Sequence, residues 1–174
     1  SLSYGNWAVD SGGGVTIDLL WLSDETIAGC QFDVHGGAVD LVDGGLLVDF
    51  DWEVYHVPDR VLAFAGFGGT PIPPSSKSAT LTTIHLAPKG NLVEITDLVF
   101  ADESGQEVIA DGPGVLNICP ADCAPAGGDG RIDVTDLLAV LSAWGAPGGS
   151  CAVDGSGTVD VGDVLPIISA WGPC

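Results

Sequence analysis

The sequence ends on a phrase that is written twice. Residues 128–145 read GDGRIDVTDLLAVLSAWG, and residues 155–172 read GSGTVDVGDVLPIISAWG. A glycine, two aspartates and a tryptophan recur 27 positions apart: Gly130, Asp133, Asp136 and Trp144 match Gly157, Asp160, Asp163 and Trp171. Both copies must form the same local structure, so this duplicated acidic turn and apolar segment constrains the fold more than any other feature.

The acidic turns have the spacing of calcium loops. A loop of the EF-hand type takes oxygen ligands from positions 1, 3, 5, 7, 9 and 12 and needs glycine at position 6. Gly130 and Gly157 fit position 6. The first copy then offers ligands at positions 5, 7, 9 and 12, namely Asp129, the Arg131 carbonyl, Asp133 and Asp136. The second offers ligands at positions 3, 5, 7, 9 and 12, namely Asp154, Ser156, the Thr158 carbonyl, Asp160 and Asp163.

Position 1 is Pro125 in the first copy and Ala152 in the second, and position 3 of the first copy is Gly127. We expect Asp122, three residues before Pro125, to replace the missing ligand through a longer loop, and water to fill the vacancy in the second loop. The alternative is a pair of acidic turns without metal, which leaves the ligand spacing of both copies unexplained.

Each loop leads into one predicted helix, and no helix precedes it. The segments 137–144 and 164–171 carry apolar residues at helical spacing and are each followed by glycine, a common helix stop. Pro166 is expected in the first turn, where proline is tolerated. The two tryptophans that end these segments are expected in the core of the module, or at an interface if they are exposed.

This tandem of calcium loop and helix resembles a dockerin. The opening CPAD, the SAWG helix endings, the final WGPC and Asp at position 12 are similar to dockerins of the planctomycete type, over residues 119–174. The resemblance implies that both loops bind Ca²⁺ and that the helices dock onto a cohesin. It also implies contacts from loop positions 10 and 11, which are Val134 and Thr135 in the first copy and Val161 and Gly162 in the second.

Residues 1–118 are predicted to form β-strands. Seven short segments rich in β-branched and aromatic residues are separated by Gly, Pro, Asp and Asn: 15–22, 27–34, 46–57, 60–67, 78–86, 91–100 and 106–110. Alternation predicts one buried face from Cys30, Phe32 and Val34, and another from Phe50, Trp52 and Val54. The fold class expected is therefore mostly β: an antiparallel β-sandwich over 1–118 followed by a small α-helical tandem calcium-loop module over 119–174.

This first region resembles a cohesin. The segments TIAGCQFDV, VLAFAGFGGTPIPP and ITDLVFADESGQEV follow the order of the cohesin family, in which an AGxQFD strand precedes a strand that ends in a Gly/Pro loop. In that family a D-x-x-x-x-D-x-x-G turn comes near the end. The resemblance implies a β-sandwich that binds dockerins. Cys30 then occupies an inward position, as a buried small apolar side chain.

Charge and cysteine content exclude several classes of partner. The 24 acidic and 4 basic residues give a net charge of −20, which excludes nucleic-acid binding and attraction to an anionic membrane. No apolar stretch is long enough for membrane insertion. Four of the five cysteines fall within 119–174 and indicate disulfides in an oxidising compartment, so we expect a secreted or cell-surface protein. Spacing leaves their pairing open: Cys174 could join Cys119 or Cys123, with Cys151 also available.

The sequence offers no case for an enzyme. Its three histidines are scattered, and Cys119 with Cys123 lacks the further ligands of a zinc site. Asp49, Asp51 and Glu53 could be offered as the carboxylates of a glycosidase, but neighbours on one strand cannot flank a bond from both sides. The segment TPIPPSSKS at 70–78 is expected to be an exposed connection and a candidate for O-linked glycans.

Three functions fit a receptor-like and a ligand-like module in one chain. The leading hypothesis is a secreted structural protein that polymerises head to tail with itself into a calcium-dependent extracellular fibre. The second is an adaptor, in a cell-surface or cellulosome-like assembly, that binds different cohesin and dockerin partners. The third is a carbohydrate-binding sandwich, for which Trp7, Trp21 and Trp52 are the candidate platforms.

Overall fold

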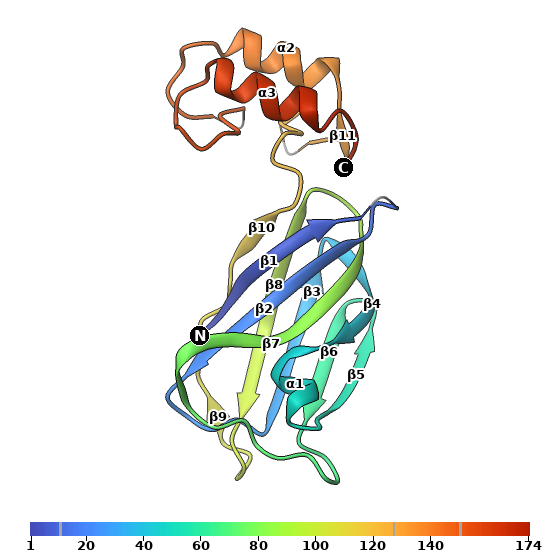
Figure 1. Ribbon diagram of the computed structural model, residues 1–174, viewed down its shortest axis with the longest axis vertical. Coiled ribbons are helices and arrows are strands. Elements are labelled where there is room, and N and C mark those ends of the chain that lie inside the picture. Colours follow the sequence, from blue (N-terminus) through green and yellow to red (C-terminus); the bar gives the residue numbers. More distant parts are fainter. Residues whose placement is uncertain (11, 127, 150) are drawn as a thin grey trace. The chain divides into compact units, whose positions relative to one another are not determined.

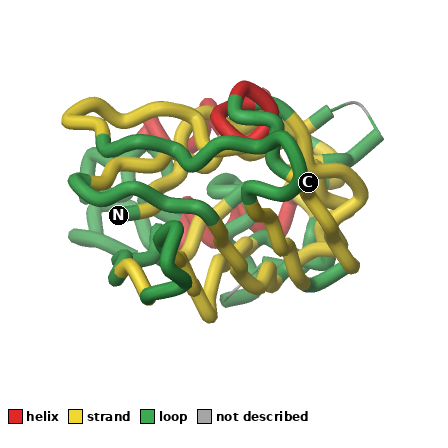
Figure 2. Tube along the Cα trace, turned by 90° about the horizontal axis from the view of Figure 1, so that it is seen from below, coloured by secondary structure: helices red, strands yellow, loops and turns green. Residues whose placement is uncertain are grey.

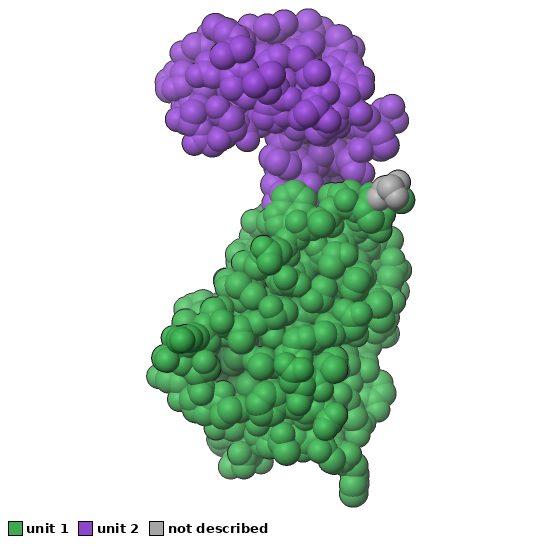
Figure 3. Space-filling model, in the orientation of Figure 1, with its two compact units in different colours: residues 1–89, 93–116 green, residues 90–92, 117–174 purple. Residues whose placement is uncertain are grey.

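The computed structural model describes residues 1–10, 12–126, 128–149 and 151–174. The chain divides into two compact units, coloured separately in Figure 3. Unit 1 holds residues 1–89 and 93–116, and unit 2 holds residues 90–92 and 117–174. Unit 2 is thus discontinuous in sequence, because it takes three residues from the middle of the strand-rich region.

Unit 1 is built from two mainly antiparallel sheets (Figure 1). The first has the order β1-β2-β7-β4, with bounds Leu2–Val9, Val15–Ser23, Ser75–Pro88 and Gly37–Asp43. The second has the order β10-β8-β3-β6-β5, with bounds Val115–Asn117, Leu92–Ala101, Gly29–His35, Arg60–Phe64 and Glu53–Val57. The short strand β9 (Glu107–Val108) pairs with β8. Most of the described chain is strand or loop (Figure 2).

The inner faces of the two sheets form the core of a β-sandwich. Alternate residues of β2 are buried, and Trp21 at its end stacks on Phe100 of β8 with ring centroids 4.1 Å apart. The predicted inward face of β3 is confirmed, since Cys30, Phe32 and Val34 are at most 3 % exposed. Cys30 is a free, buried thiol whose pKa burial raises to about 12, so it behaves as a small apolar side chain.

The prediction of a single strand over 46–57 was wrong. The chain instead forms a short helix, α1 (Gly45–Asp49), and strand β5 begins only at Glu53. At Gly45 the backbone passes so close to β7 that a Cβ would lie 2.7 Å from the Leu81 carbonyl oxygen, which leaves no room for a strand side chain. Asp49 and Asp51 therefore do not share a strand face with Glu53.

Other departures concern edges and connections. The sequence reading missed β1, β4 and β10, which contain Gly, Asn, Asp or Ser and lack a strong alternating pattern. The segment 70–78 is not wholly a connection, because β7 starts at Ser75 and bonds to Ser23 of β2. Its residues Ser75–Ser78 are nevertheless exposed.

Unit 2 contains two nine-residue helices, α2 (Val134–Ser142) and α3 (Val161–Ser169). Two short strands, β11 (Arg131–Ile132) and β12 (Gly172–Pro173), pair antiparallel. Buried apolar and cysteine side chains form its core: Cys119, Ala121, Cys123, Ile132, Val140, Cys151, Val159 and Ile167. No helix among the described residues is long and apolar enough to cross a membrane.

Both helices begin three residues before the predicted segments because aspartates cap them. Asp133 and Asp160 are the N-caps, and each forms a capping box with the aspartate three residues later. Pro166 is consequently the sixth residue of α3, so its predicted place in the first turn was wrong. The prediction that Trp144 and Trp171 belong to the core was also wrong: they lie beyond the helix ends and are 52 % and 51 % exposed.

Two disulfides staple unit 2. Cys119 pairs with Cys174, and Cys123 pairs with Cys151. The first bridge joins the beginning of the unit's long segment to its last residue. The second lies beside the two loops, with all four cysteines at least partly buried.

Candidate calcium loops and apolar surfaces

The second acidic loop brings three carboxylates together. One oxygen each of Asp154, Asp160 and Asp163 lies within 4.8 Å of the others. Asp163 is fully buried, whereas the other two are exposed. Gly157 adopts the left-handed conformation that this turn requires, with φ +79°. Three anionic groups at this separation repel one another, and a cation bound between them would offset that repulsion.

Hydrogen bonds hold Asp163 in place from both sides of its loop. Its Oδ1 accepts from the backbone N–H of Asp154 at 3.0 Å and its Oδ2 from that of Asp160 at 2.8 Å. These backbone donors lower the pKa of Asp163 below its ordinary value. The Ser156 hydroxyl donates to the Thr158 carbonyl, so the expected ligands at positions 5 and 7 are neighbours.

The first loop is arranged around Asp136 in the same way. Its Oδ2 accepts from the N–H of Asp133, as Asp163 accepts from Asp160. Its Oδ1 accepts from the N–H groups of Cys123 and Ala124 at 2.8 and 2.9 Å. Ala124 thus takes the place that Asp154 has in the second loop, although the repeat spacing would put residue 127 there. The first loop is therefore three residues longer between these points.

This longer loop gives Asp122 the place of position 1. Asp122 directly precedes Cys123, as Ala152 precedes Val153 in the second loop. Its carboxylate is 4 % exposed and accepts from the N–H groups of Asp129 and Gly130, the residues at positions 5 and 6. The two loops therefore lack different ligands. The first has the Asp122 carboxylate at position 1 and Ala124 at position 3, whereas the second has Ala152 at position 1 and the Asp154 carboxylate at position 3.

The described carboxylates of the first loop are less tightly gathered than those of the second. Asp122, Asp129, Asp133 and Asp136 do not supply three oxygens within 4.8 Å of one another among the residues that the structure describes, and Gly127 lies outside them. Asp129 accepts from the Arg131 N–H, and Asp133 accepts from the Thr135 N–H, which lowers the Asp133 pKa. Asp122 also lies near Cys119 and Cys174, but a disulfide occupies both sulfurs, so these offer no thiolate to a metal.

The donor sets suit calcium. Carboxylates, a serine hydroxyl and backbone carbonyls are hard oxygen ligands. Ca²⁺ prefers such ligands and typically coordinates about six to eight of them. The buried Asp136 and Asp163 at position 12 are held by three or two backbone N–H donors, so their oxygens are oriented before any cation arrives.

The outward faces of α2 and α3 carry matching apolar side chains, here called the helix stripes. Spacings of four and three residues place the first three members of each set on one side of its helix, and a tryptophan follows just beyond the helix end. They are 51–65 % exposed and equivalent in the two repeats: Val134, Leu138, Leu141 and Trp144, and Val161, Leu165, Ile168 and Trp171. The predicted contact residues Val134 and Val161 belong to them, Thr135 beside Val134 is exposed, and Gly162 is half-buried. The sequence reading named the two tryptophans as interface residues if exposed, but it missed Leu138, Leu141, Leu165 and Ile168, although their 27-residue recurrence was visible.

Unit 1 has an apolar row of its own on the outer face of the second sheet. The strand registers align Val99 of β8, Gln31 of β3, Leu62 of β6 and Tyr55 of β5. Val99, Leu62 and Tyr55 are 46 %, 40 % and 55 % exposed, and together they are called the sheet row. Beside them, Arg60 donates two hydrogen bonds to Asp33 at 2.5 and 2.7 Å.

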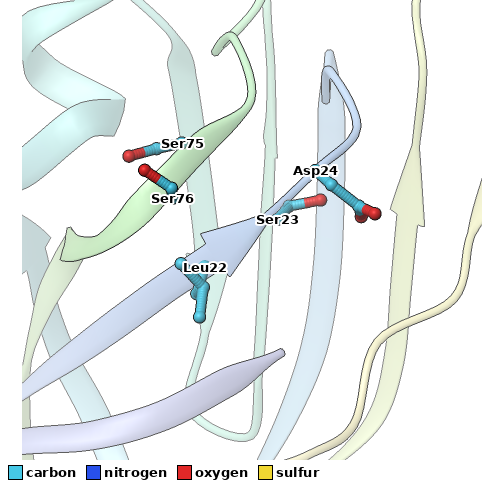
Figure 4. A pocket seen from close by; sticks show the side chains of 5 residues that line it. All are labelled: Leu22, Ser23, Asp24, Ser75 and Ser76. Atoms are coloured by element: carbon cyan, nitrogen blue, oxygen red, sulfur yellow. The ribbon is translucent and has the colours of Figure 1, made fainter.

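Two shallow pockets lie on the described part of unit 1. A pocket of about 340 Å³ is lined by Leu22, Ser23, Asp24, Ser75 and Ser76. Figure 4 shows the hydroxyls of Ser75 and Ser76 pointing away from the Asp24 carboxylate, so these side chains do not form a nucleophile and base. A second pocket, beside Glu53 and Phe67, is lined mainly by apolar and glycine residues.

The candidate sugar platforms outside unit 2 are mostly buried. Trp21 and Trp52 are 3 % and 7 % exposed, and the Trp52 ring donates to the Thr70 carbonyl at 2.8 Å. Trp7, at 37 %, is the more accessible of the three. A single partly exposed ring is a poor platform for a carbohydrate chain.

Comparison with solved structures finds cohesins. A non-cellulosomal cohesin from the hyperthermophilic archaeon Archaeoglobus fulgidus matches 55 % of this chain and 72 % of its own, with 13 % identity and a TM-score of 0.37. The complex of CaCohA2 with a CaDoc0917 variant gives 14 % identity, coverage of 66 % and 96 %, and a TM-score of 0.43. The third cohesin of ScaC, in complex with the ScaB dockerin from Acetivibrio cellulolyticus, is 17 % identical. The match covers 66 % of this chain and 95 % of that cohesin, with a TM-score of 0.43.

No family model matches the sequence, and no curated protein matches it.

Proposed function

We propose that this is a secreted, non-catalytic structural protein whose copies join head to tail. In this proposal, the helix stripes of unit 2 in one molecule bind the sheet row of unit 1 in the next. Ca²⁺ in the two loops holds the helices in their binding arrangement. Repetition of this contact builds an extracellular fibre.

The observation that carries the proposal is the pair of unlike apolar surfaces in one chain. The helix stripes expose three large apolar side chains on each helix and a tryptophan just beyond its end, and the sheet row exposes one on each of β8, β6 and β5, with Gln31 of β3 between the first two. Exposed apolar side chains gathered on one face of a protein favour a protein-binding role. Because the two surfaces differ, contact between copies is heterologous, and it continues into a filament unless the rotation closes a ring.

The acidic loops support a requirement for calcium. A cation between the three clustered carboxylates of the second loop would offset their mutual repulsion, and both loops lead directly into the helices that carry the stripes. Two bound Ca²⁺ ions would change the net charge from −20 to about −16, which reduces repulsion between neighbouring copies. The two disulfides fit an oxidising, extracellular setting, and the exposed serines of 70–78 are acceptors for O-linked sugars in the same proposal.

A mixing experiment tests the proposal directly. Leu62→Asp should disable the sheet row, and Leu138→Asp with Leu165→Asp should disable both helix stripes, each weakening association about 30-fold or more, as at central interface residues. Light scattering in calcium should show large, concentration-dependent species for the unchanged protein and single chains for each variant. The two variants mixed should form two-chain complexes and nothing longer, since each retains one working surface.

Leu41→Asp is the matched control, because Leu41 is 46 % exposed on β4 of the other sheet. This variant should assemble like the unchanged protein, and chelation should dissolve every assembly. Unchanged protein that stays a single chain at high concentration in calcium would overturn self-assembly. It would favour the second function, an adaptor that binds different cohesin or dockerin partners.

A further inference from the structure

A short segment far from the acidic loops in sequence belongs to unit 2. Residues 90–92 comprise the end of the connection from β7 and the first residue of β8, yet they group with 117–174. The Asn91 side chain is 6 % exposed, and its backbone carbonyl accepts from the Ile118 N–H at 2.8 Å. Asn91 is therefore an interior residue of unit 2, 31 positions before Asp122.

Asn91 binds the carboxylate that occupies position 1 of the first loop. Its Nδ2 donates to Asp122 Oδ2 at 2.6 Å. The same oxygen accepts from the N–H groups of Gly130 at 2.7 Å and Asp129 at 3.0 Å. Three donors thus surround Oδ2, while Oδ1 receives only a longer contact, 3.2 Å, from Asp129 among the described residues. Oδ1 is the oxygen left to face a cation.

Packing alone gives no reason for an asparagine here. Asn91 Oδ1 is buried and accepts no hydrogen bond from the residues that the structure describes. A buried amide oxygen without a donor destabilises the folded state, so an apolar side chain of the same size would pack at lower cost. What an apolar side chain cannot supply is the N–H donor for Asp122.

The first loop closes tightly over this pair. A Cβ added to Gly128 would overlap both Asn91 Nδ2 and Asp122 Oδ2, and Gly128 has φ +74°. Side chains that hydrogen-bond to a metal-binding group fix its orientation and strengthen metal binding. Here the donor comes from outside the loop and from a distant part of the chain.

We infer that Asn91 is a positioning residue of the first calcium loop, acting through Asp122. The inference rests on the proposed binding of calcium and adds a residue outside the repeated motif. It makes the connection between β7 and β8 part of the metal-binding unit.

The test is calorimetric titration of the full chain with CaCl₂. The Asp160→Asn background weakens the second loop but keeps an amide oxygen to cap α3, so the first loop dominates the titration. In that background Asn91→Leu should weaken calcium binding about 10–100-fold, the usual effect of removing a group that orients a metal ligand. Asn91→Asp keeps the shape of the side chain but removes the donor, and it should also weaken binding.

A double-mutant cycle separates positioning from a general loss of structure. Once Asp122→Asn has removed the carboxylate, Asn91→Leu should change calcium affinity less than about twofold, because its effect passes through Asp122. Asn117→Leu, which removes a hydrogen bond to the Cys119 N–H in the same unit, is the control and should leave affinity unchanged. An Asn91→Leu effect of equal size with and without Asp122 would overturn the inference.

The remaining outcomes are distinct. Tighter binding by Asn91→Asp would overturn the inference, since residue 91 would then contact the cation itself. Unchanged protein that binds two calcium ions, with Asn91→Leu equally able, would refute the role of Asn91 and leave the proposed function standing. Unchanged protein that binds no calcium would refute both.

Discussion

At the scale of single residues, the 27-residue repeat predicted the kind of side chain at a loop position more reliably than it predicted which residue occupies that position. The carboxylates at positions 9 and 12 recur 27 residues apart and have matching hydrogen bonds, as the periodicity of the sequence predicted, while their role as calcium ligands stays a prediction. The sequence also indicated Asp122, three residues before Pro125, as a replacement through a longer loop. The structure shows that extension and the N–H groups of Asp129 and Gly130 that donate to Asp122, and its role as a calcium ligand stays a prediction. Asn91 could not be found from the sequence, since no pattern links it to a loop 31 residues away.

Asp163 should stabilise the metal-free protein in a pH-dependent way. Backbone N–H donors lower its folded-state pKa, so its contribution is present above the unfolded value of about 3.9 and is lost as pH falls through the lower folded value. The unfolding free energy of Asp163→Asn, measured by urea denaturation with chelator, should therefore be lower than that of the unchanged protein at pH 7. The difference should shrink below about pH 4.

Asp24→Asn changes an exposed carboxylate of unit 1 and serves as the control. Its effect on the unfolding free energy should be small across the same range. A deficit of Asp163→Asn that stayed constant down to pH 2 would contradict the assigned cause.

At the scale of elements, strong alternation and helical spacing predicted most of the structure. Strands β2, β3, β6 and β8 and both long helices lie within a few residues of the predicted segments. The errors came where tertiary contact overrides local pattern. The segment 46–57 alternates like a strand, but close approach to Leu81 and burial of Leu47 select helix α1 at its start. The edge strand β4 pairs along β7, a contact that its own composition does not signal.

Pro166 gives a matched test of helix stability. It lies inside α3, where proline cannot donate to the preceding turn, and its equivalent in α2 is Ala139. Pro166→Ala should raise the unfolding free energy by about 1–3 kcal/mol, and Ala139→Pro should lower it by about 3 kcal/mol. Both are measured by chemical denaturation of the disulfide-bonded protein.

Equal and small effects at both positions would show that α3 tolerates proline through local adjustment of its first turns. Helix content from circular dichroism before denaturation separates a changed helix from a changed free energy. The exchange leaves all members of the helix stripes intact.

At the scale of the whole molecule, charge opposes both folding and assembly. A net charge of −20 over 174 residues with four basic side chains means that carboxylates repel one another throughout the chain. The one described Arg–carboxylate ion pair joins Arg60 to Asp33 on the outer sheet face. Dissolved salt, together with calcium if the proposed function holds, is therefore expected to do much of the neutralisation that basic residues do in other proteins.

Salt should stabilise the metal-free protein. Raising NaCl from about 10 mM to 500 mM shortens the Debye length from about 30 Å to less than 8 Å and screens most of the self-repulsion. The melting temperature in chelator, measured by calorimetry, should rise by several degrees over this range. In saturating calcium the rise should be smaller. A melting temperature independent of salt would contradict a dominant role for repulsion.

The discontinuity of unit 2 limits how this chain can be cut and recombined. A gene segment that begins at Asn117 encodes both loops, both helices and all four bridged cysteines. From its sequence alone, this cassette resembles an independent domain that could be moved to another protein. It omits Asn91, which belongs to the same unit but is encoded between the strands of the sandwich. Moved to another host protein, that cassette would carry Asp122 with one of its three donors to Oδ2 missing. We therefore expect the segment from Asn117 to keep its full set of donors to Asp122 only when it is moved together with the part of the chain that contains Asn91.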